Sequence, residues 1–238
     1  MDAKYKRCLL KISGESLAGA AGYGFDGATI GDIAAQVAEI VRQGVQVGLV
    51  VGGGNIWRGL PAAEKSLMDR FTADNMGMLA TVMNALYLRS AIEEQGVPCR
   101  VESAIPMEPV APGFDLRRST AFLEQGGVVI FAAGSGHPYF STDTAAALRA
   151  AEIGADVILM AKKVDGVYTA DPKTDPTARR IPRLTMLDVV QQQLRVMDLT
   201  AAAMCRDNHI PIVVFKIDQP GNMLKAVMGE DVGTTVEV

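Results

Sequence analysis

Two glycine-rich segments, each associated with a basic residue, carry the most informative chemistry in the sequence. Lys11-Ile12-Ser13-Gly14 follows one apolar run, and Gly52-Gly53-Gly54 follows another, with Arg58 a few residues beyond it. Glycine lets backbone N–H groups approach phosphate oxygens closely, and Lys and Arg side chains supply positive charge. A glycine triplet alone is more often a tight turn, and a lone arginine is often only solvated. Taken together, the two segments favour a site for a phosphate-bearing ligand.

A third segment combines small and hydroxyl-bearing residues, and it leads into a predicted helix. It runs from Gly134 to Thr142 and is followed by Asp143. Ser141, Thr142 or Asp143 can cap this helix, which would leave its first backbone donors facing a ligand. His137 lies within the segment, but one histidine in a glycine loop more often packs or hydrogen-bonds than acts as a catalytic base.

A fourth segment contains residues that suit a nucleoside. Asp165-Gly166 predicts a turn, and Tyr168 and Asp171 could face a purine base and a ribose or metal-linked phosphate. Both residues could equally belong to an ordinary exposed loop. No glycine in the chain is followed by lysine, so a Walker-type phosphate loop is excluded. We also expect that no Gly-x-Gly-x-x-Gly dinucleotide fingerprint opens a helix.

The segments that must position these residues alternate between strand-like and helix-like patterns. Such alternation predicts an α/β fold with a mainly parallel sheet, in which ligands bind beyond the carboxyl ends of the strands. A glycine-rich loop is expected from Gly14 to Gly27. Strands are predicted at Cys8–Ile12, Val45–Val51, Cys99–Glu102, Val128–Ala132, Val157–Met160 and Ile212–Phe215, and helices over residues 33–41, Asp74–Glu94, Leu116–Glu124 and Thr142–Ile153.

Composition narrows the class of protein. A length of 238 residues with 49% hydrophobic content suits one domain over residues 1–238. A net charge of -4 argues against nucleic-acid binding through a broad basic face, and no apolar run is long enough to cross a membrane. Cys8, Cys99 and Cys205 are far apart and form no Cys-x-x-Cys pair, which fits a reducing cytoplasm.

The order of these segments resembles the amino acid kinase superfamily and, within it, the bacterial uridylate kinase family, over nearly the whole chain. No single sequence motif decides the resemblance, but the set of motifs together does. The most specific strings are Lys11-Ile12-Ser13-Gly14-Glu15, Gly52-Gly53-Gly54-Asn55 with Arg58-Gly59, Asp74-Asn75-Met76-Gly77-Met78-Leu79-Ala80-Thr81, the segment from Gly134 to Asp143, Val164-Asp165-Gly166-Val167-Tyr168 with Ala170-Asp171-Pro172, and Val196-Met197-Asp198.

The resemblance implies a three-layer αβα sandwich and the ATP-dependent phosphorylation of UMP to UDP in pyrimidine nucleotide biosynthesis. The catalytic residues it implies are Lys11, Arg58 and Asp143, with Asp143 positioning the lysine. The residues implied to contact ATP are Lys11, Ile12, Ser13, Gly14, Gly54, Arg58, Tyr168 and Asp171. Those implied to contact UMP are Gly53, Asp74, Ser135, Gly136, His137, Pro138, Tyr139, Phe140, Ser141 and Thr142.

The resemblance also implies a homohexamer, Mg²⁺ carried with ATP instead of on a dedicated protein site, and UTP inhibition. GTP activation would involve the segment Gly19-Ala20-Ala21-Gly22-Tyr23-Gly24, although this segment lacks an acidic residue found in some relatives. Lys162 stands where threonine or asparagine is usual, so we assign no ATP contact to it. His137 stands where asparagine is common.

Two other functions stay open at this point. One is a kinase of the same superfamily that acts on a carboxylate, a carbamate or isopentenyl phosphate. A carboxylate kinase would be expected to lack Asp74 and the set from Ser135 to Thr142. The other is a non-catalytic ATP-binding protein that stores metal oxides, for which two histidines, His137 and His209, are few.

The implied reaction needs positioning and charge neutralisation more than covalent chemistry. A nucleoside monophosphate has a second pKa of about 6, so it already presents a charged oxygen at neutral pH. In-line transfer of the γ-phosphoryl group therefore requires no general base. We expect Lys11 and Asp143 to meet across the strand ends.

Overall fold

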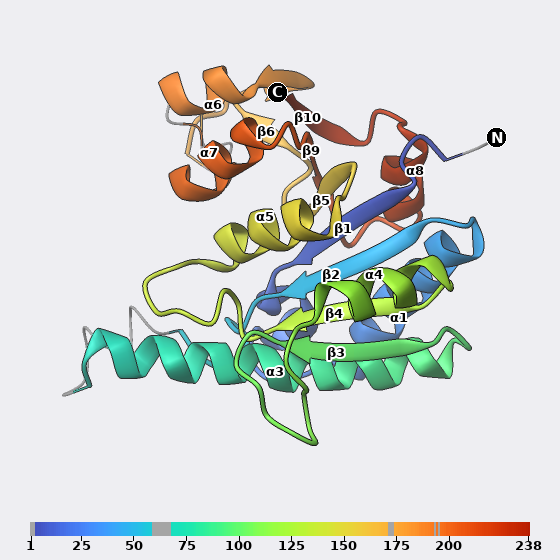
Figure 1. Ribbon diagram of the computed structural model, residues 1–238. Coiled ribbons are helices and arrows are strands. Elements are labelled where there is room, and N and C mark those ends of the chain that lie inside the picture. Colours follow the sequence, from blue (N-terminus) through green and yellow to red (C-terminus); the bar gives the residue numbers. More distant parts are fainter. Residues whose placement is uncertain (1–2, 59–67, 171–173, 193, 195) are drawn as a thin grey trace.

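An eight-stranded sheet forms the centre of the protein (Figure 1). The computed structural model describes residues 3–58, 68–170, 174–192, 194 and 196–238. The sheet has the order β3-β4-β2-β1-β5-β9-β10-β8, and its neighbouring strands are parallel except for β9 and β10. Its strands are β1 (Arg7–Ile12), β2 (Gln46–Val51), β3 (Cys99–Ser103), β4 (Val128–Ala132), β5 (Val157–Lys162), β8 (Arg183–Thr185), β9 (Ile212–Lys216) and β10 (Gly233–Glu237).

Helices cover both faces of the sheet, which gives the three layers predicted from the sequence (Figure 1). One layer packs α1 against α3 and α8, and the other packs α5 against α4 and α7, with α6 beside α7. A separate hairpin joins β6 (Val167–Tyr168) and β7 (Arg180–Ile181). The helices are η1 (Gly14–Ala21, a 3₁₀ helix), α1 (Gly27–Arg42), α3 (Arg70–Glu94), α4 (Leu116–Glu124), α5 (Thr142–Ile153), α6 (Met186–Gln191), α7 (Leu199–Asp207) and α8 (Asn222–Met228).

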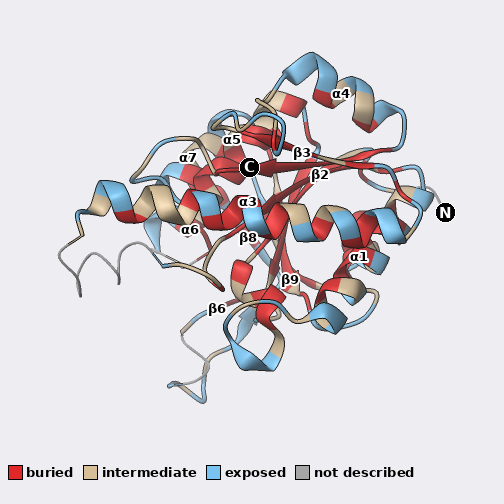
Figure 2. Ribbon diagram, turned by 90° about the horizontal axis from the view of Figure 1, so that it is seen from below, coloured by how far each residue is buried: buried red, intermediate tan, exposed pale blue. Residues whose placement is uncertain are grey.

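Two apolar cores result, because successive side chains of a strand point to opposite faces. Leu9 belongs to the core beneath α5, whereas its neighbour Leu10 belongs to the core beneath α1 and α3. Val128–Ala132 is buried throughout, as expected of a strand covered on both faces. Figure 2 shows the buried strands enclosed by helices whose outer surfaces are exposed. Among the described residues, no helix combines the length and apolarity that crossing a membrane requires.

The predicted bounds of β4, α4 and α5 match the structure. The predicted loop from Gly14 to Gly27 is wrong in its first part, because Gly14–Ala21 forms a 3₁₀ helix kinked at Gly19. Helix α3 begins at Arg70, earlier than predicted, because the Asp69 side chain caps it by accepting from Thr72 N–H.

The expectation that no Gly-x-Gly-x-x-Gly motif opens a helix is wrong. Gly22-x-Gly24-x-x-Gly27 does lead into α1, which begins at Gly27. The motif follows a 3₁₀ helix instead of a strand, however, so it lacks the strand-loop-helix context of a dinucleotide site.

Candidate active site

Lys11 and Asp143 meet at the carboxyl edge of the sheet. The Nζ atom of Lys11 lies 2.6 Å from Oδ1 of Asp143, in an ion pair outside hydrogen-bond geometry. The Lys11 side chain is 11% exposed and that of Asp143 is 18% exposed, so water screens the pair only partly. Lys11 lies near the end of β1, and Asp143 lies in the first turn of α5, as the sequence predicts.

The first turn of α5 is fixed by its capping residue and by the start of α7. Ser141 is the N-cap, and its Oγ accepts from Asp143 N–H and Thr144 N–H at 3.0 and 3.2 Å. Ser141 and Thr144 both donate hydroxyl hydrogen bonds to the Asp198 carboxylate. Asp198 in turn caps α7 by accepting from Ala201 N–H at 2.9 Å. The N-terminus of α5, with its partial positive charge, is therefore held at the site.

The two glycine loops pack closely against each other. A Cβ atom on Gly14 would lie 2.5 Å from the carbonyl oxygen of Gly52 and 2.7 Å from the nitrogen of Gly54. A Cβ atom on Gly53 would lie 2.8 Å from the carbonyl oxygen of Gly77, on α3. Only glycine allows these close approaches. The Ile12 side chain is buried in the core, so only its backbone is available to a ligand.

A pair of buried asparagines supports these loops. Asn84 Nδ2 donates to the carbonyl oxygen of Gly52 at 2.6 Å and to Asn55 Oδ1 at 2.7 Å. Asn55 Nδ2 donates to Asn84 Oδ1 and to the carbonyl oxygen of Gly24. Sequence reasoning missed Asn84. Its position on the mainly apolar buried face of α3 was the available signal, because a fully buried amide needs hydrogen-bond partners.

Arg58 lies over the second glycine loop. Its guanidinium forms an ion pair with Glu15 and donates from Nε to the carbonyl oxygen of Gly54 at 3.4 Å. Both side chains of this ion pair are exposed, so a phosphate can compete with the Glu15 carboxylate for the guanidinium.

A cavity of about 140 Å³ lies between α3 and the segment that precedes α5. Six of the residues predicted to contact UMP line it: Gly53, Asp74, Ser135, Phe140, Ser141 and Thr142. Sequence reasoning missed the other lining residues, Trp57, Gly77, Met78, Thr81 and Gly134. The spacing of 74, 77, 78 and 81 was a usable signal, because it places these residues on one face of a helix.

Asp74 connects α3 to the segment between β4 and α5. Its Oδ2 accepts from Arg70 Nε at 2.7 Å and from Tyr139 N–H at 2.9 Å. We expected Asp74 at the start of the helix, but it lies in the second turn of α3, which begins at Arg70. Among the residues that the structure describes, none hydrogen-bonds to its Oδ1.

The remaining residues predicted to contact UMP lie outside the cavity lining, and these are Gly136, His137, Pro138 and Tyr139. His137 is exposed, and its ring Nδ1 lies 3.2 Å from the carbonyl oxygen of Ser135. Its contacts are local, as expected for a hydrogen-bonding residue in a glycine loop.

Lys162 lies at the end of β5, beside the Lys11–Asp143 pair, and donates to the carbonyl oxygen of Val196. Burial lowers the pKa of Lys162, and the nearby Lys11 lowers it further, while Asp143 acts in the opposite direction.

Of the two residues predicted for the adenosine side, the structure describes Tyr168. Tyr168 lies in β6, and its hydroxyl donates to Asp165 Oδ1 at 2.8 Å, a bond that raises the pKa of the phenol. Asp171 lies outside the described residues. The segment Gly19–Gly24 spans the end of η1, where Gly22 adopts a left-handed conformation and Gly24 N–H donates to the carbonyl oxygen of Asn55.

The fold and the two glycine loops are those of a phosphoryl-transfer protein, and the chain belongs to the amino acid kinase family, whose sequence profile matches residues 6–216. The chain is similar to the UMP kinase of Bacillus anthracis, with a TM-score of 0.95 and 41% identity over 98% of this chain and 96% of that one.

Two further solved structures are similar. The UMP kinase of Ureaplasma parvum matches with a TM-score of 0.92 and 40% identity, over 99% of this chain and all of that one (100%). The uridylate kinase of Archaeoglobus fulgidus matches with a TM-score of 0.75 and 31% identity, over 96% of this chain and 99% of that one. These comparisons confirm the resemblance to the uridylate kinase branch.

Proposed function

We propose that this protein transfers the γ-phosphoryl group of ATP to UMP, forming UDP in pyrimidine nucleotide biosynthesis. The observation that carries the proposal is the Lys11–Asp143 ion pair, which lies at the carboxyl edge of the sheet with the two glycine loops. The similarity to three structures described as UMP or uridylate kinases supports the choice of acceptor.

UMP occupies the side of the site bordered by α3 and the segment before α5. The Asp74 carboxylate accepts hydrogen bonds from ribose hydroxyls, while Gly53 and the segment from Ser135 to Thr142 enclose the nucleotide. The cavity, about 140 Å³, is smaller than the 300–1,000 Å³ typical of ligand pockets, so it encloses only part of the nucleotide.

ATP occupies the other side, with its phosphates over Lys11, Ser13, Gly14 and Gly54. Arg58 exchanges its contact with Glu15 for a contact with the phosphates. Tyr168 faces the adenosine, and the resemblance implies that Asp171, which lies outside the described residues, contacts it as well. Asp143 acts through Lys11, whose ammonium it holds where the transferred group passes.

The reaction proceeds by in-line attack of a UMP phosphate oxygen and needs no general base. That oxygen is charged at neutral pH, because the second pKa of a nucleoside monophosphate is about 6. Preorganised positive charge from Lys11, Arg58 and the loop amides stabilises the transferred group. His137 has no chemical role in this account.

Mg²⁺ reaches the site on the phosphates of ATP, where it neutralises developing charge. The described residues contain no group of three His, Cys, Asp or Glu side chains that could hold a metal ion. Two carboxylates at the N-terminus of α5 are already engaged, Asp143 with Lys11 and Asp198 with the hydroxyls of Ser141 and Thr144. This arrangement favours a metal held by the substrate.

We further propose that residues 1–238 form a single amino acid kinase domain and that the protein acts in the cytoplasm as a homohexamer. A single sheet whose strands range from Arg7 to Glu237 supports one domain, and three free, buried cysteines support a cytoplasmic location. GTP activation through Gly19–Gly24 and inhibition by UTP rest on the resemblance alone.

A coupled assay that measures ADP release tests the proposed acceptor. We expect rapid turnover with UMP and little or none with CMP, glutamate or carbamate. Lys11→Ala serves as the control for contaminating kinases. Faster turnover with glutamate or carbamate than with UMP would contradict the proposal.

A further inference from the structure

The segment between β4 and α5, residues 133–141, has an unfavourable backbone conformation at two positions. Among the described residues, three that are not glycine have a positive φ, and two of these, Ala133 at 60° and Tyr139 at 70°, lie in this segment. A residue with a Cβ atom rarely adopts such a left-handed conformation, and it persists only where neighbouring contacts enforce it. The contacts that enforce it here therefore shape the proposed UMP side, which this segment borders.

Both residues donate their backbone N–H group to a side chain of α3. Ala133 N–H donates to Thr81 Oγ1 at 2.8 Å, and Tyr139 N–H donates to Asp74 Oδ2 at 2.9 Å. Asp74 and Thr81 are about two helical turns apart, so both side chains lie on the same face of α3. This face of the helix therefore holds the segment at two points.

The Thr81 hydroxyl is oriented as an acceptor toward Ala133. Its single proton is donated to the carbonyl oxygen of Met78 at 2.7 Å, which leaves its oxygen lone pairs for the Ala133 N–H group. Thr81 is 3% exposed and Ala133 is 0% exposed, so water has little access to this hydrogen bond. Loss of the hydroxyl would leave a buried N–H group without its partner, which is costly.

Ala133 also begins the turn that leads into the segment. Its carbonyl oxygen accepts from Gly136 N–H at 2.9 Å, and Gly134 and Ser135 of this turn line the proposed UMP cavity together with Thr81. We propose that Thr81 is a positioning residue for the acceptor nucleotide, which acts through Ala133 to hold the segment before α5 in its binding conformation. This inference deepens the proposed function and rests on it.

Two replacements of Thr81 separate its hydroxyl from its shape. Thr81→Val keeps the shape and removes the hydroxyl, so it should raise KM for UMP about tenfold and change KM for ATP little. Thr81→Ser keeps the hydroxyl and should stay within about twofold of the unaltered protein. An unchanged KM for UMP in Thr81→Val, or equal increases for both substrates, would overturn the proposal.

Ala133→Gly distinguishes positioning from direct contact with UMP. Glycine adopts a positive φ without the steric cost that alanine has, so adding Ala133→Gly to Thr81→Val should lower KM for UMP again by about threefold. A direct contact between Thr81 and UMP could not be restored in this way. A double variant whose KM for UMP equals that of Thr81→Val would therefore contradict the positioning role.

Thr234 provides a matched control for the loss of a buried threonine hydroxyl. Its hydroxyl donates to the carbonyl oxygen of Ile181 at 2.6 Å and accepts from Val167 N–H at 2.8 Å, which is the same pair of contacts. Thr234 lies in β10 and does not line the proposed UMP cavity. Thr234→Val should lower the urea midpoint of unfolding as Thr81→Val does but leave KM for UMP unchanged. An equal rise in KM for UMP in both variants would contradict the proposal.

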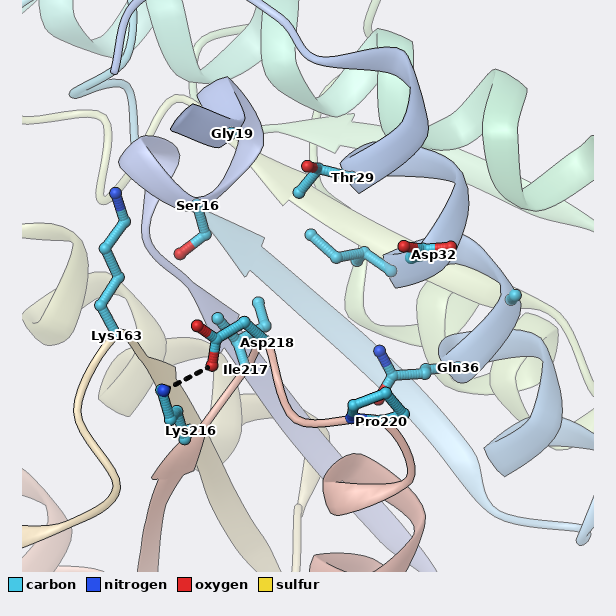
Figure 3. A pocket seen from close by; sticks show the side chains of 12 residues that line it. Ser16, Gly19, Thr29, Asp32, Gln36, Lys163, Lys216, Ile217, Asp218 and Pro220 are labelled. Carbon is cyan, nitrogen blue, oxygen red and sulfur yellow. Dashed lines mark ion pairs between the residues drawn. The ribbon is translucent and has the colours of Figure 1, made fainter. Parts of the chain in front are cut away.

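A second control lies on α1, which packs against α3. Asp32 lines a separate cavity of about 670 Å³ between α1 and the loop that joins β9 to α8 (Figure 3). Among the described residues, none lines both this cavity and the proposed UMP cavity. Asp32→Asn should therefore leave KM for UMP unchanged. A rise as large as that in Thr81→Val would mean that the UMP side responds to any change near α3, which contradicts a specific role for Thr81.

Hydrogen exchange measured by mass spectrometry tests the contact without any nucleotide. In Thr81→Val, peptides that cover residues 133–141 should exchange faster than in the unaltered protein, while Val128–Ala132 should exchange at the same rate in both. Thr81→Ser should match the unaltered protein throughout. Unchanged exchange in Thr81→Val would overturn the proposal even if UMP is the acceptor. Faster exchange in a protein that does not phosphorylate UMP would instead contradict the proposed function and not the contact between Thr81 and Ala133.

Discussion

The ammonium nitrogen of Lys11 lies 2.6 Å from Oδ1 of Asp143, although the two residues are far apart in sequence. The parallel sheet causes this meeting, because it brings the end of β1 and the start of α5, the helix that follows β4, to one edge. Capping of α5 by Ser141 and the contacts of Asp198 then fix the carboxylate. This pair is the basis of the proposed mechanism.

Replacing Lys11 tests its catalytic role. Lys11→Ala should lower kcat by about 10²-fold or more with a modest change in KM for UMP, since the lysine stabilises the transferred group and not bound UMP. Steady-state kinetics on both substrates measures the effect. Lys6→Ala, which removes an exposed lysine before β1, is the control and should leave turnover unchanged. Near-normal turnover in Lys11→Ala would remove this residue from the mechanism.

Replacing Asp74 tests the acceptor side. Asp74→Asn should raise KM for UMP much more than KM for ATP, because an amide accepts ribose hydrogen bonds less well than a carboxylate does. Arg70→Gln is the control for the helix contact, since Arg70 Nε donates to the same carboxylate at 2.7 Å. Equal increases for both substrates in Asp74→Asn would indicate a role in folding or closure instead.

The pH profile tests the absence of a general base. Values of kcat/KM for UMP should fall below pH about 6, as the substrate phosphate gains its second proton. A histidine with an ordinary pKa near 6.5 could produce a similar limb, so the profile of His137→Asn must be compared with that of the unaltered protein. We expect the variant to retain both activity and the acid limb. Loss of the limb together with collapse of the rate at neutral pH would identify His137 as the base.

Two glycines provide a matched test of loop packing. Gly14→Ala should lower stability by about 1–3 kcal/mol and reduce kcat, because its Cβ would lie 2.5 Å from the Gly52 carbonyl oxygen. Gly31→Ala places a Cβ in open space within α1 and should stabilise by about 0.5–1 kcal/mol. Chemical denaturation measures both changes. If Gly14→Ala proves as harmless as Gly31→Ala, the close contact between the loops is not required.

Thiol labelling tests the buried cysteines. Burial raises the pKa values of the Cys8, Cys99 and Cys205 thiols to about 12, so little thiolate exists at pH 8. We expect no reaction of the native protein with a thiol reagent at pH 8, and reaction of three thiols in denaturant. Rapid labelling of the native protein would show that one of these residues is accessible.

Much of the scaffold could be predicted from sequence because its signals are local. Val128–Ala132 is a continuous apolar run, and Thr142–Ile153 follows a capping serine, so both elements could be assigned with their observed bounds. The 3₁₀ helix from Gly14 to Ala21 could not be predicted, because its glycine-rich sequence is typical of a loop and tertiary contacts determine its conformation.

Some residues of the candidate site could likewise be predicted from the sequence, and others could not. The glycine loops, Lys11 and Asp143 could be predicted, since parallel strands bring the segments after them to one edge. The partners of Arg58 and Ser141 could not be predicted. Glu15 contacts Arg58, and Asp198 contacts Ser141, only as a result of tertiary packing. The buried Asn84, which fixes a loop from a distant helix, belongs to the same class.

Phosphorus NMR of the protein with ATP, Mg²⁺ and UMP tests the central claim most directly, because it identifies the product as well as the rate. The account predicts that the UMP signal disappears while the two signals of UDP appear together with those of ADP, in equal amounts. Release of inorganic phosphate from ATP with UMP left unchanged, or no consumption of ATP at all, would contradict it.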